Sequence, residues 1–173
     1  MLKQTAIAFI FSLVSTISLA QEAPQLNDAQ IAHIAYTAGQ IDVSAAKLAL
    51  EKSEDPKVRS FAELMESDHS AVNEEALALV SRLNVTPEEN AVSSSLASQA
   101  LEAEQRLRSL SGGEFDRAYV ENEVAYHQAV NDALKSVLIP NAQNSELKSL
   151  LETGLALFQE HQSHAEHLLH EMK

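Results

Sequence analysis

The sequence predicts an all-α protein, a bundle of four long amphipathic helices in one domain. Apolar residues recur at steps of three and four over segments of about 25 residues, which is the period of helices with one buried face. Glycine and proline number four each, and they fall where helices should stop. Strand-like alternation of apolar and polar residues is absent from the sequence. A chain of 173 residues is also long enough to bury a sizeable core.

Two helices are predicted in the first half of the chain, over residues 27–52 and 55–83. Asn27 with Gln30 three positions later indicates a capping box, and Asp55-Pro56 indicates a second helix start. The apolar stripe of the first helix consists of Ile31, Ile34, Ala38, Ile41, Ala45 and Leu48. The stripe of the second helix consists of Val58, Phe61, Ala62, Met65, Val72, Ala76, Val80 and Leu83.

Residues 84–113 are predicted to form a long connection that contains a shorter helix. Thr86-Pro87-Glu88-Glu89 is typical of a helix start, and Ser111-Gly112-Gly113 is expected to end that helix. A helix of about 17 residues is roughly 25 Å long, so the connection can run the length of the bundle and make the second and third long helices parallel. That arrangement is the ferritin-like topology, a four-helix bundle with a long, partly helical crossover. The alternative is a plain up-and-down bundle with an extra helix.

A second hairpin is predicted in the last third of the chain. Its first helix covers residues 114–138, and Pro140 should prevent much continuation. Its second helix starts near Asn144 or Ser145 and continues to the C-terminus. The apolar stripe of that helix consists of Leu147, Leu151, Leu155, Phe158, Ala165 and Leu168.

Residues 1–20 differ from the rest and are predicted to be a secretory signal peptide. Met1-Leu2-Lys3-Gln4 is a short, positively charged start, and the apolar run that follows carries no charge up to Ser18-Leu19-Ala20, which places small residues before a cleavage position. Cleavage after Ala20 would leave residues 21–173 as one helical domain in the bacterial periplasm. The apolar run is too short for a comfortable membrane span, so the mature form is expected to have none.

The charge and the absence of cysteine exclude several kinds of function. The formal net charge is −13, and it becomes −14 when the leader with Lys3 is removed. Such a surface repels phosphate backbones and anionic lipids, so nucleic acid is not an expected partner. The chain has no cysteine, which rules out disulfides, thiol nucleophiles and thiolate metal ligands. No Ser/His/Asp nucleophile pattern or phosphate-binding loop is present, so no catalytic residue is predicted.

Polar residues on the apolar stripes are the informative ones. His69, His127 and His161 lie on the buried faces of the second, third and fourth long helices, and Asp42 lies near the apolar edge of the first. His69 is 14 residues into its helix and His127 is 13 into its own, so parallel helices would put both at one level, close to that of Asp42. His161 is expected one to two turns lower.

These side chains predict a metal site in the core of the bundle, held by His69, His127 and His161 with Asp42 or Glu123 completing the shell. Imidazole and carboxylate ligands suit a divalent transition metal such as Zn, Cu or Fe. A di-iron enzyme is not favoured, because it needs two Glu-x-x-His pairs and only Glu66 with His69 supplies that spacing. The alternative hypothesis is a structural or interaction module without metal, whose histidines are hydrogen-bonded core residues.

The C-terminal helix also carries His164, His167 and His170 after His161. A step of three residues rotates by about −60° around a helix, so the four rings cannot share one ion. His167 and His170 are therefore interpreted as a solvated face and as cations near the C-terminal end of a helix.

The chain resembles the exported bacterial family called domain of unknown function 4142, which is grouped with ferritin-like folds. The resemblance lies in segments across nearly all of the mature chain: Lys47-Leu48-Ala49-Leu50, Asp55-Pro56-Lys57-Val58, Phe61-Ala62, Met65-x-x-Asp68-His69-x-x-x-Asn73, Phe115-Asp116-Arg117-Ala118-Tyr119-Val120, His127 and His161-x-x-x-Ala165. It implies a ferritin-like bundle outside the cytoplasm and singles out the same three core histidines. The family pattern usually has Glu where this chain has Asp42. The resemblance implies no activity. Together with the core histidines, it leads to the hypothesis of a periplasmic metal-binding or stress-associated bundle.

Overall fold

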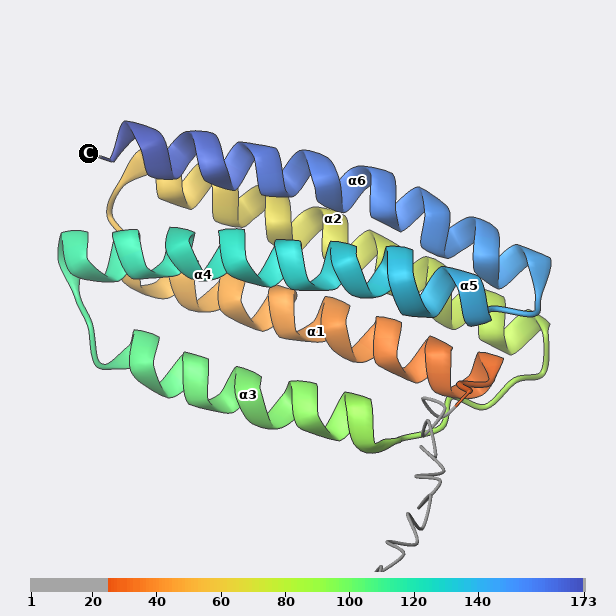
Figure 1. Cartoon of the computed structure of the whole chain (residues 1–173). Coiled ribbons are helices and arrows are strands. Elements are labelled where there is room, and N and C mark those ends of the chain that lie inside the picture. The colour runs from red at the N-terminus through yellow and green to blue at the C-terminus, as the bar shows by residue number, and fades with distance from the viewer. Residues whose placement is uncertain (1–24, 173) are drawn as a thin grey trace, which may run out of the picture.

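The computed structural model describes residues 25–172 as a four-helix bundle with a fifth helix along one side (Figure 1). The bundle helices are α1 (Asp28–Lys52), α2 (Pro56–Arg82), α4 (Gly112–Ala133) and α6 (Ser145–Glu171). Helices α1 and α2 form one antiparallel hairpin and α4 and α6 form another, while α3 (Ala91–Arg108) connects them. Because α3 returns the chain to the starting end of α2, α4 runs parallel to α2, as the crossover topology predicts.

Local capping explains where the first two helices begin. The Asn27 side chain accepts a hydrogen bond from the Gln30 backbone N–H, and the Gln30 side chain accepts one from the Asn27 backbone N–H. Asp55 caps α2 through the backbone N–H groups of Lys57 and Val58. The predicted helix starts at these two positions are confirmed.

The third helix starts four residues later than the Thr86-Pro87 signal suggests. Asn90 is the N-cap, and its side chain accepts from the backbone N–H groups of Val92 and Ser93. The residues before Asn90 contact α1 and do not start α3. The Glu88 N–H donates to the Ala29 carbonyl at 3.0 Å, which ties the connection to α1. The glycines also act differently from the prediction: Gly112, at φ +55°, opens α4 rather than only closing the helix before it.

The helical stretch that begins with α4 continues three residues past its predicted end at residue 138, and it stops one residue after Pro140, which limits the continuation as expected. Leu134–Leu138 forms one π-helical stretch, η1, and Ile139–Asn141 adds a further turn, α5, that contains Pro140. The Ile139 N–H donates to the Leu134 carbonyl, five residues back. Proline lacks an N–H, and the wider π turn lets the chain continue without the bond that Pro140 cannot make.

Two apolar cores fill the two ends of the bundle. The first apolar core lies where α1 joins α2 and comprises Ala46, Leu48, Ala49, Val58, Phe61, Ala62, Met65, Leu107, Phe115, Tyr119, Val120, Ala165 and Leu168. The second apolar core lies at the opposite end and comprises Leu26, Ile31, Ile34, Leu79, Leu134, Leu138, Leu147, Leu151 and Phe158. A layer of buried polar side chains lies between them along the helices.

The predicted signal peptide, residues 1–20, lies outside the described residues. No helix within residues 25–172 has the length and apolar character needed to cross a membrane.

Candidate metal centre

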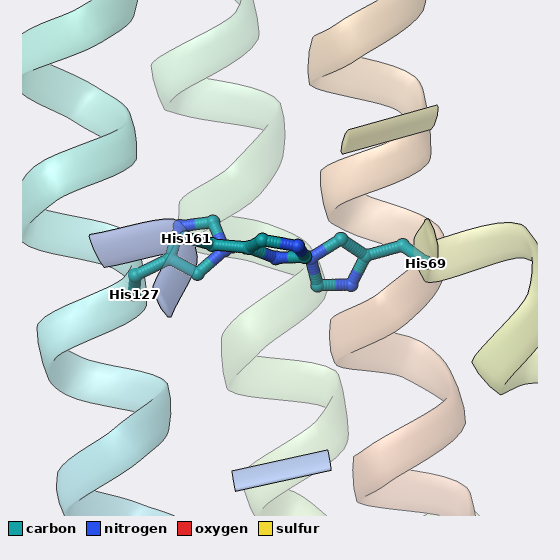
Figure 2. Close-up of side chains that lie close together, drawn as sticks. All are labelled: His69, His127 and His161. Atoms are coloured by element: carbon teal, nitrogen blue, oxygen red, sulfur yellow. The ribbon is translucent and has the colours of Figure 1, made fainter. Parts of the chain in front are cut away.

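Each of the four bundle helices contributes to one buried polar layer, which we call the histidine layer. It consists of Asp42 from α1, His69 from α2, Glu123 and His127 from α4, and His161 from α6. All five side chains are at most 3% exposed. The three imidazole rings point toward one another from three helices (Figure 2), and each offers a nitrogen within 4.8 Å of the others.

Three ligand-type atoms in this layer form an almost equilateral triangle. His69 Nε2 and His127 Nε2 are 3.4 Å apart, and Asp42 Oδ2 is 3.5 Å from each of them. A tetrahedral ion with bonds of about 2.1 Å has ligand atoms about 3.4 Å apart. The triangle therefore has the dimensions of one face of such a coordination shell.

Hydrogen bonds decide which ring nitrogen of His127 and of His161 carries the proton and which one keeps its lone pair. His127 Nδ1 lies 3.0 Å from the Glu123 backbone carbonyl, which can only accept, so Nδ1 carries the proton and Nε2 keeps its lone pair. His161 Nε2 donates to Asp68 Oδ2 at 3.0 Å, which leaves the lone pair on the buried Nδ1. Metal-bound histidines commonly have this second hydrogen bond to a carbonyl or carboxylate.

His69 is held mainly by stacking, since its Nδ1 has no hydrogen-bond partner among the described residues and its Nε2 contacts only His127 Nε2, at 3.4 Å, and the Asp42 carboxylate. Its ring lies on that of Phe158, with centroids 4.5 Å apart and planes inclined by 10°. Asn131 donates to the Phe158 backbone carbonyl at 3.2 Å and to Gln162 Oε1 at 3.0 Å, so it fixes the position of α6 beside α4. These contacts keep Nε2 of His69 directed at the triangle.

Several polar atoms of the layer have no hydrogen-bond partner among the described residues. These atoms are both carboxylate oxygens of Asp42, both of Glu123, and Nδ1 of His69 and His161. His127 Nδ1 lies 3.6 Å from Glu123 Oε2, which is too long for a good bond. Burying a carboxyl group without a partner is costly, so this concentration requires an explanation.

Burial shifts every titratable group in the layer toward its neutral form. It raises the pKa of Asp42 to about 8 and the pKa of Glu123 well above its usual value. It lowers the pKa of His69 to about 2 and that of His127 to about 4. Burial also lowers the pKa of His161, against the opposing effect of its bond to Asp68. At neutral pH the imidazoles are neutral, which is the form that binds metals.

The structure brings all the residues named from the sequence into one layer, but the height expected for His161 is wrong. Its ring centroid lies 5.3 Å from that of His69 and 5.5 Å from that of His127, not one to two turns lower. The error follows from the extra turn through Asn141. The helical stretch runs 14 residues beyond His127, so the 16 residues from Ser145 to His161 return to the same level.

Three features of the site lie beyond the sequence prediction. The Asp68 carboxylate is 28% exposed and contacts a buried histidine of another helix. The sequence predicts Phe158 in the core but does not predict its stacking on His69. Asn73 and Asn131 are both buried and follow His69 and His127 by four residues, a spacing that could have marked them as polar neighbours of the layer.

The other C-terminal histidines lie outside the layer. His164, His167 and His170 are exposed, and His164 packs edge-on against Phe61 with centroids 5.1 Å apart. His167 lies 3.5 Å from Glu171 at the end of α6. The solvated face predicted for His167 and His170 agrees with their exposure.

Comparison with known proteins identifies the family. A family model described as domain of unknown function DUF4142 matches residues 15–168. The chain belongs to the DUF4142 family. Its fold is similar to the crystal structure of a protein from Streptomyces coelicolor described as secreted and as DUF305, with a TM-score of 0.71, 13% identity, and coverage of 84% of this chain and 93% of that one. At that identity the likeness shows the fold alone. No curated protein matches this DUF4142 chain.

Proposed function

We propose that this DUF4142 protein binds one divalent transition-metal ion in the histidine layer, through His69, His127, His161 and Asp42. The observation that carries the proposal is the triangle of His69 Nε2, His127 Nε2 and Asp42 Oδ2, with edges of 3.4, 3.5 and 3.5 Å. Those lengths match the ligand spacing of a tetrahedral ion, for which Zn²⁺ has the fewest geometric demands. Nitrogen and oxygen donors together also suit Cu²⁺ and Fe²⁺.

The fourth ligand is Nδ1 of His161. Its Nε2 is already bonded to Asp68, so Nδ1 is the nitrogen with a free lone pair, and it is buried without a partner. Asp68 fixes the orientation of the ring and increases its basicity, in the same way that the Glu123 carbonyl does for His127. The resulting shell takes one ligand from each bundle helix.

The unpartnered carboxyl group of Asp42 supports a bound cation more than it supports a purely structural role for the histidines. Hydrogen bonds to Glu123 and Asp68 account for one nitrogen each of His127 and His161. They do not account for Asp42, whose two oxygens are buried beside neutral rings with no partner among the described residues. A divalent ion would give that carboxylate a ligand bond and offset the cost of its burial.

We also propose that the protein acts outside the cytoplasm, in the periplasm, after removal of residues 1–20. Support comes from the charged and apolar pattern of those residues and from the Streptomyces coelicolor protein with a similar fold, whose name calls it a secreted protein. Mass spectrometry of the mature protein from the periplasmic fraction would test this. An N-terminus at Gln21 is expected, and an intact Met1 in the cytoplasmic fraction would refute it.

The metal proposal is tested by elemental analysis of untagged protein. We expect about one equivalent of metal per chain, its loss in the double variant H69A/H127A, and retention in the control H167A/H170A, which removes two exposed histidines. Metal at about 100 times its Kd should stabilise the native state by about 2.7 kcal/mol. A protein without metal whose melting temperature does not respond to Zn²⁺, Cu²⁺ or Fe²⁺ contradicts the proposal.

A further inference from the structure

A large apolar cavity lies between the bundle and α3, separate from the metal ligands. Its volume is about 650 Å³, and its walls come from all five long helices. Small-molecule sites commonly have volumes of about 300–1,000 Å³ and mostly apolar walls. The cavity therefore has the size and the lining of a ligand site.

The cavity exists because small side chains face one another where large ones would close the space. The alanines that line it are Ala32, Ala35, Ala38, Ala45, Ala76, Ala97, Ala100, Ala103, Ala125, Ala129 and Ala133. Helix α3 supplies little packing over this stretch, since its only fully buried residues are Ser93 and Leu107, one near each end. Because α1, α2, α3 and α4 all present alanine here, no side chain from these helices fills the space under the middle of α3.

Both ends of α3 are fastened to the bundle. At the start, the Glu88 N–H donates to the Ala29 carbonyl at 3.0 Å, and the Asn90 side chain donates to the Gln30 carbonyl at 3.3 Å. At the other end, Lys52 Nζ donates to the Arg108 carbonyl at 2.6 Å. A helix about 10–12 Å wide could enter only if α3 were released, so the covered space favours a slimmer occupant.

One polar group in the wall of the cavity lacks a partner. Asn73 is 4% exposed, lines the cavity, and has an Nδ2 with no hydrogen-bond partner among the described residues. The Asn73 side chain can occupy this position because residue 39 is glycine. A Cβ at Gly39 would overlap the Asn73 amide. An amide kept free in an apolar cavity is suited to fix the polar end of a ligand.

From these observations we infer that the cavity binds an elongated, mainly apolar small molecule with an uncharged polar head. The head accepts a hydrogen bond from Asn73, and the chain lies under the alanines of α3. The head is not a carboxylate, because Glu104, the only charged residue among the described residues of the lining, would repel it, and it is not an ammonium group, because that has no lone pair to accept a hydrogen bond from Asn73. This binding activity does not depend on the metal site, although Phe158 both lines the cavity and stacks on His69.

The test uses 1-monoolein, which combines a neutral ester head with one apolar chain, on the full chain in native mass spectrometry and fluorescent-probe displacement. We expect one molecule per chain with a micromolar Kd, and binding of palmitate at pH 8 at least tenfold weaker. The variant A100F should raise the Kd for monoolein at least tenfold. The control A156F, an exposed alanine of α6 outside the lining, should change the Kd less than twofold.

A second pair of variants keeps the inference testable if A100F does not fold by circular dichroism. A129F fills the cavity from the exposed side of α4 and should weaken binding to the same degree. N73L should weaken monoolein binding about tenfold while leaving hexadecane binding unchanged, since hexadecane has no acceptor. Absence of saturable binding, binding that A100F and A129F leave unchanged, or a dimer that A100F converts to monomer would overturn the inference.

Discussion

The first apolar core and the histidine layer are equally buried, yet they contribute to the fold in opposite ways. Phe61, Met65 and Phe115 are fully buried among other apolar side chains, so each stabilises the native state by leaving water. In the layer one or two turns away, Asp42 and Glu123 are just as buried but lack hydrogen-bond partners among the described residues. The first apolar core stabilises the native state. The histidine layer destabilises it unless a ligand binds there.

This contrast explains how a chain without disulfides can hold an unfavourable polar layer. The layer lies between the first and second apolar cores, which fix the four helices on either side of it. The ring positions therefore follow from packing at a distance and need no bound ion to be set. Such preorganisation is typical of sites in which the scaffold offsets the cost of the function.

The largest expected effect comes from opening the first apolar core. Phe61→Ala removes a fully buried ring that packs edge-on against Tyr119, and it should reduce the free energy of unfolding by about 3–5 kcal/mol. Metal stoichiometry should stay unchanged, because Phe61 lies two helical turns before His69. Urea unfolding followed by circular dichroism measures the first quantity, and elemental analysis the second. A loss of metal in the folded variant would show that the two regions are not independent.

Most of the fold could be predicted because its signals are local. The Asn27–Gln30 capping box and the Asp55-Pro56 start act within one helical turn, so the sequence alone contains both partners. The π turn before Pro140 could not be predicted in this way, because it depends on whether α6 is placed to receive a longer α4. Ala38 and Ile41 were predicted to lie in the bundle core, but they are only half-buried and line the cavity under α3.

An intermediate effect is expected from neutralising the buried carboxyl of Asp42. Its folded pKa, about 8, is above the ordinary value of 3.8, so its favourable contribution is complete below about pH 4 and is lost as pH rises through 8. Asp42→Asn should therefore stabilise the metal-free protein by about 2 kcal/mol at pH 8 and by little at pH 4.

The measurement for Asp42→Asn is urea unfolding of both proteins with chelator present at pH 4, 6 and 8. The difference reports the Asp42 carboxyl together with its effect on Glu123, whose pKa Asp42 helps to raise. The variant should bind Zn²⁺ at least tenfold more weakly than the unmodified chain, since a neutral amide replaces a carboxylate ligand. Lower stability of the metal-free variant at pH 8 would mean that Asp42 has a stabilising partner, contrary to the contacts described.

Counting residues along parallel helices was enough to predict that His69 and His127 lie level, but it could not assign the remaining contacts of the layer. The Asp68 carboxylate could have pointed to solvent, and only the angle at which α6 crosses α2 brings it to His161. The stacking of Phe158 on His69 also depends on this packing. Contacts between helices far apart in sequence depend on helix rotation, which periodicity leaves undetermined by tens of degrees.

The smallest expected effect concerns Asp68, which acts on the metal only through His161. Asp68→Asn should weaken Zn²⁺ binding about tenfold, or about 1.4 kcal/mol, because an amide holds the Nε2–H of His161 less firmly and leaves Nδ1 less basic. The melting temperature of the metal-free protein should barely change, since Asp68 is partly exposed. Glu66→Gln is the matched control on the same helix, and its weak 3.8 Å pair with Lys47 should not affect metal binding. Competition titration against a zinc-sensitive dye separates the two variants. Equal Zn²⁺ affinities of the Asp68→Asn and Glu66→Gln variants would show that Asp68 does not affect metal binding. Its bond to His161 would then be only a contact between helices.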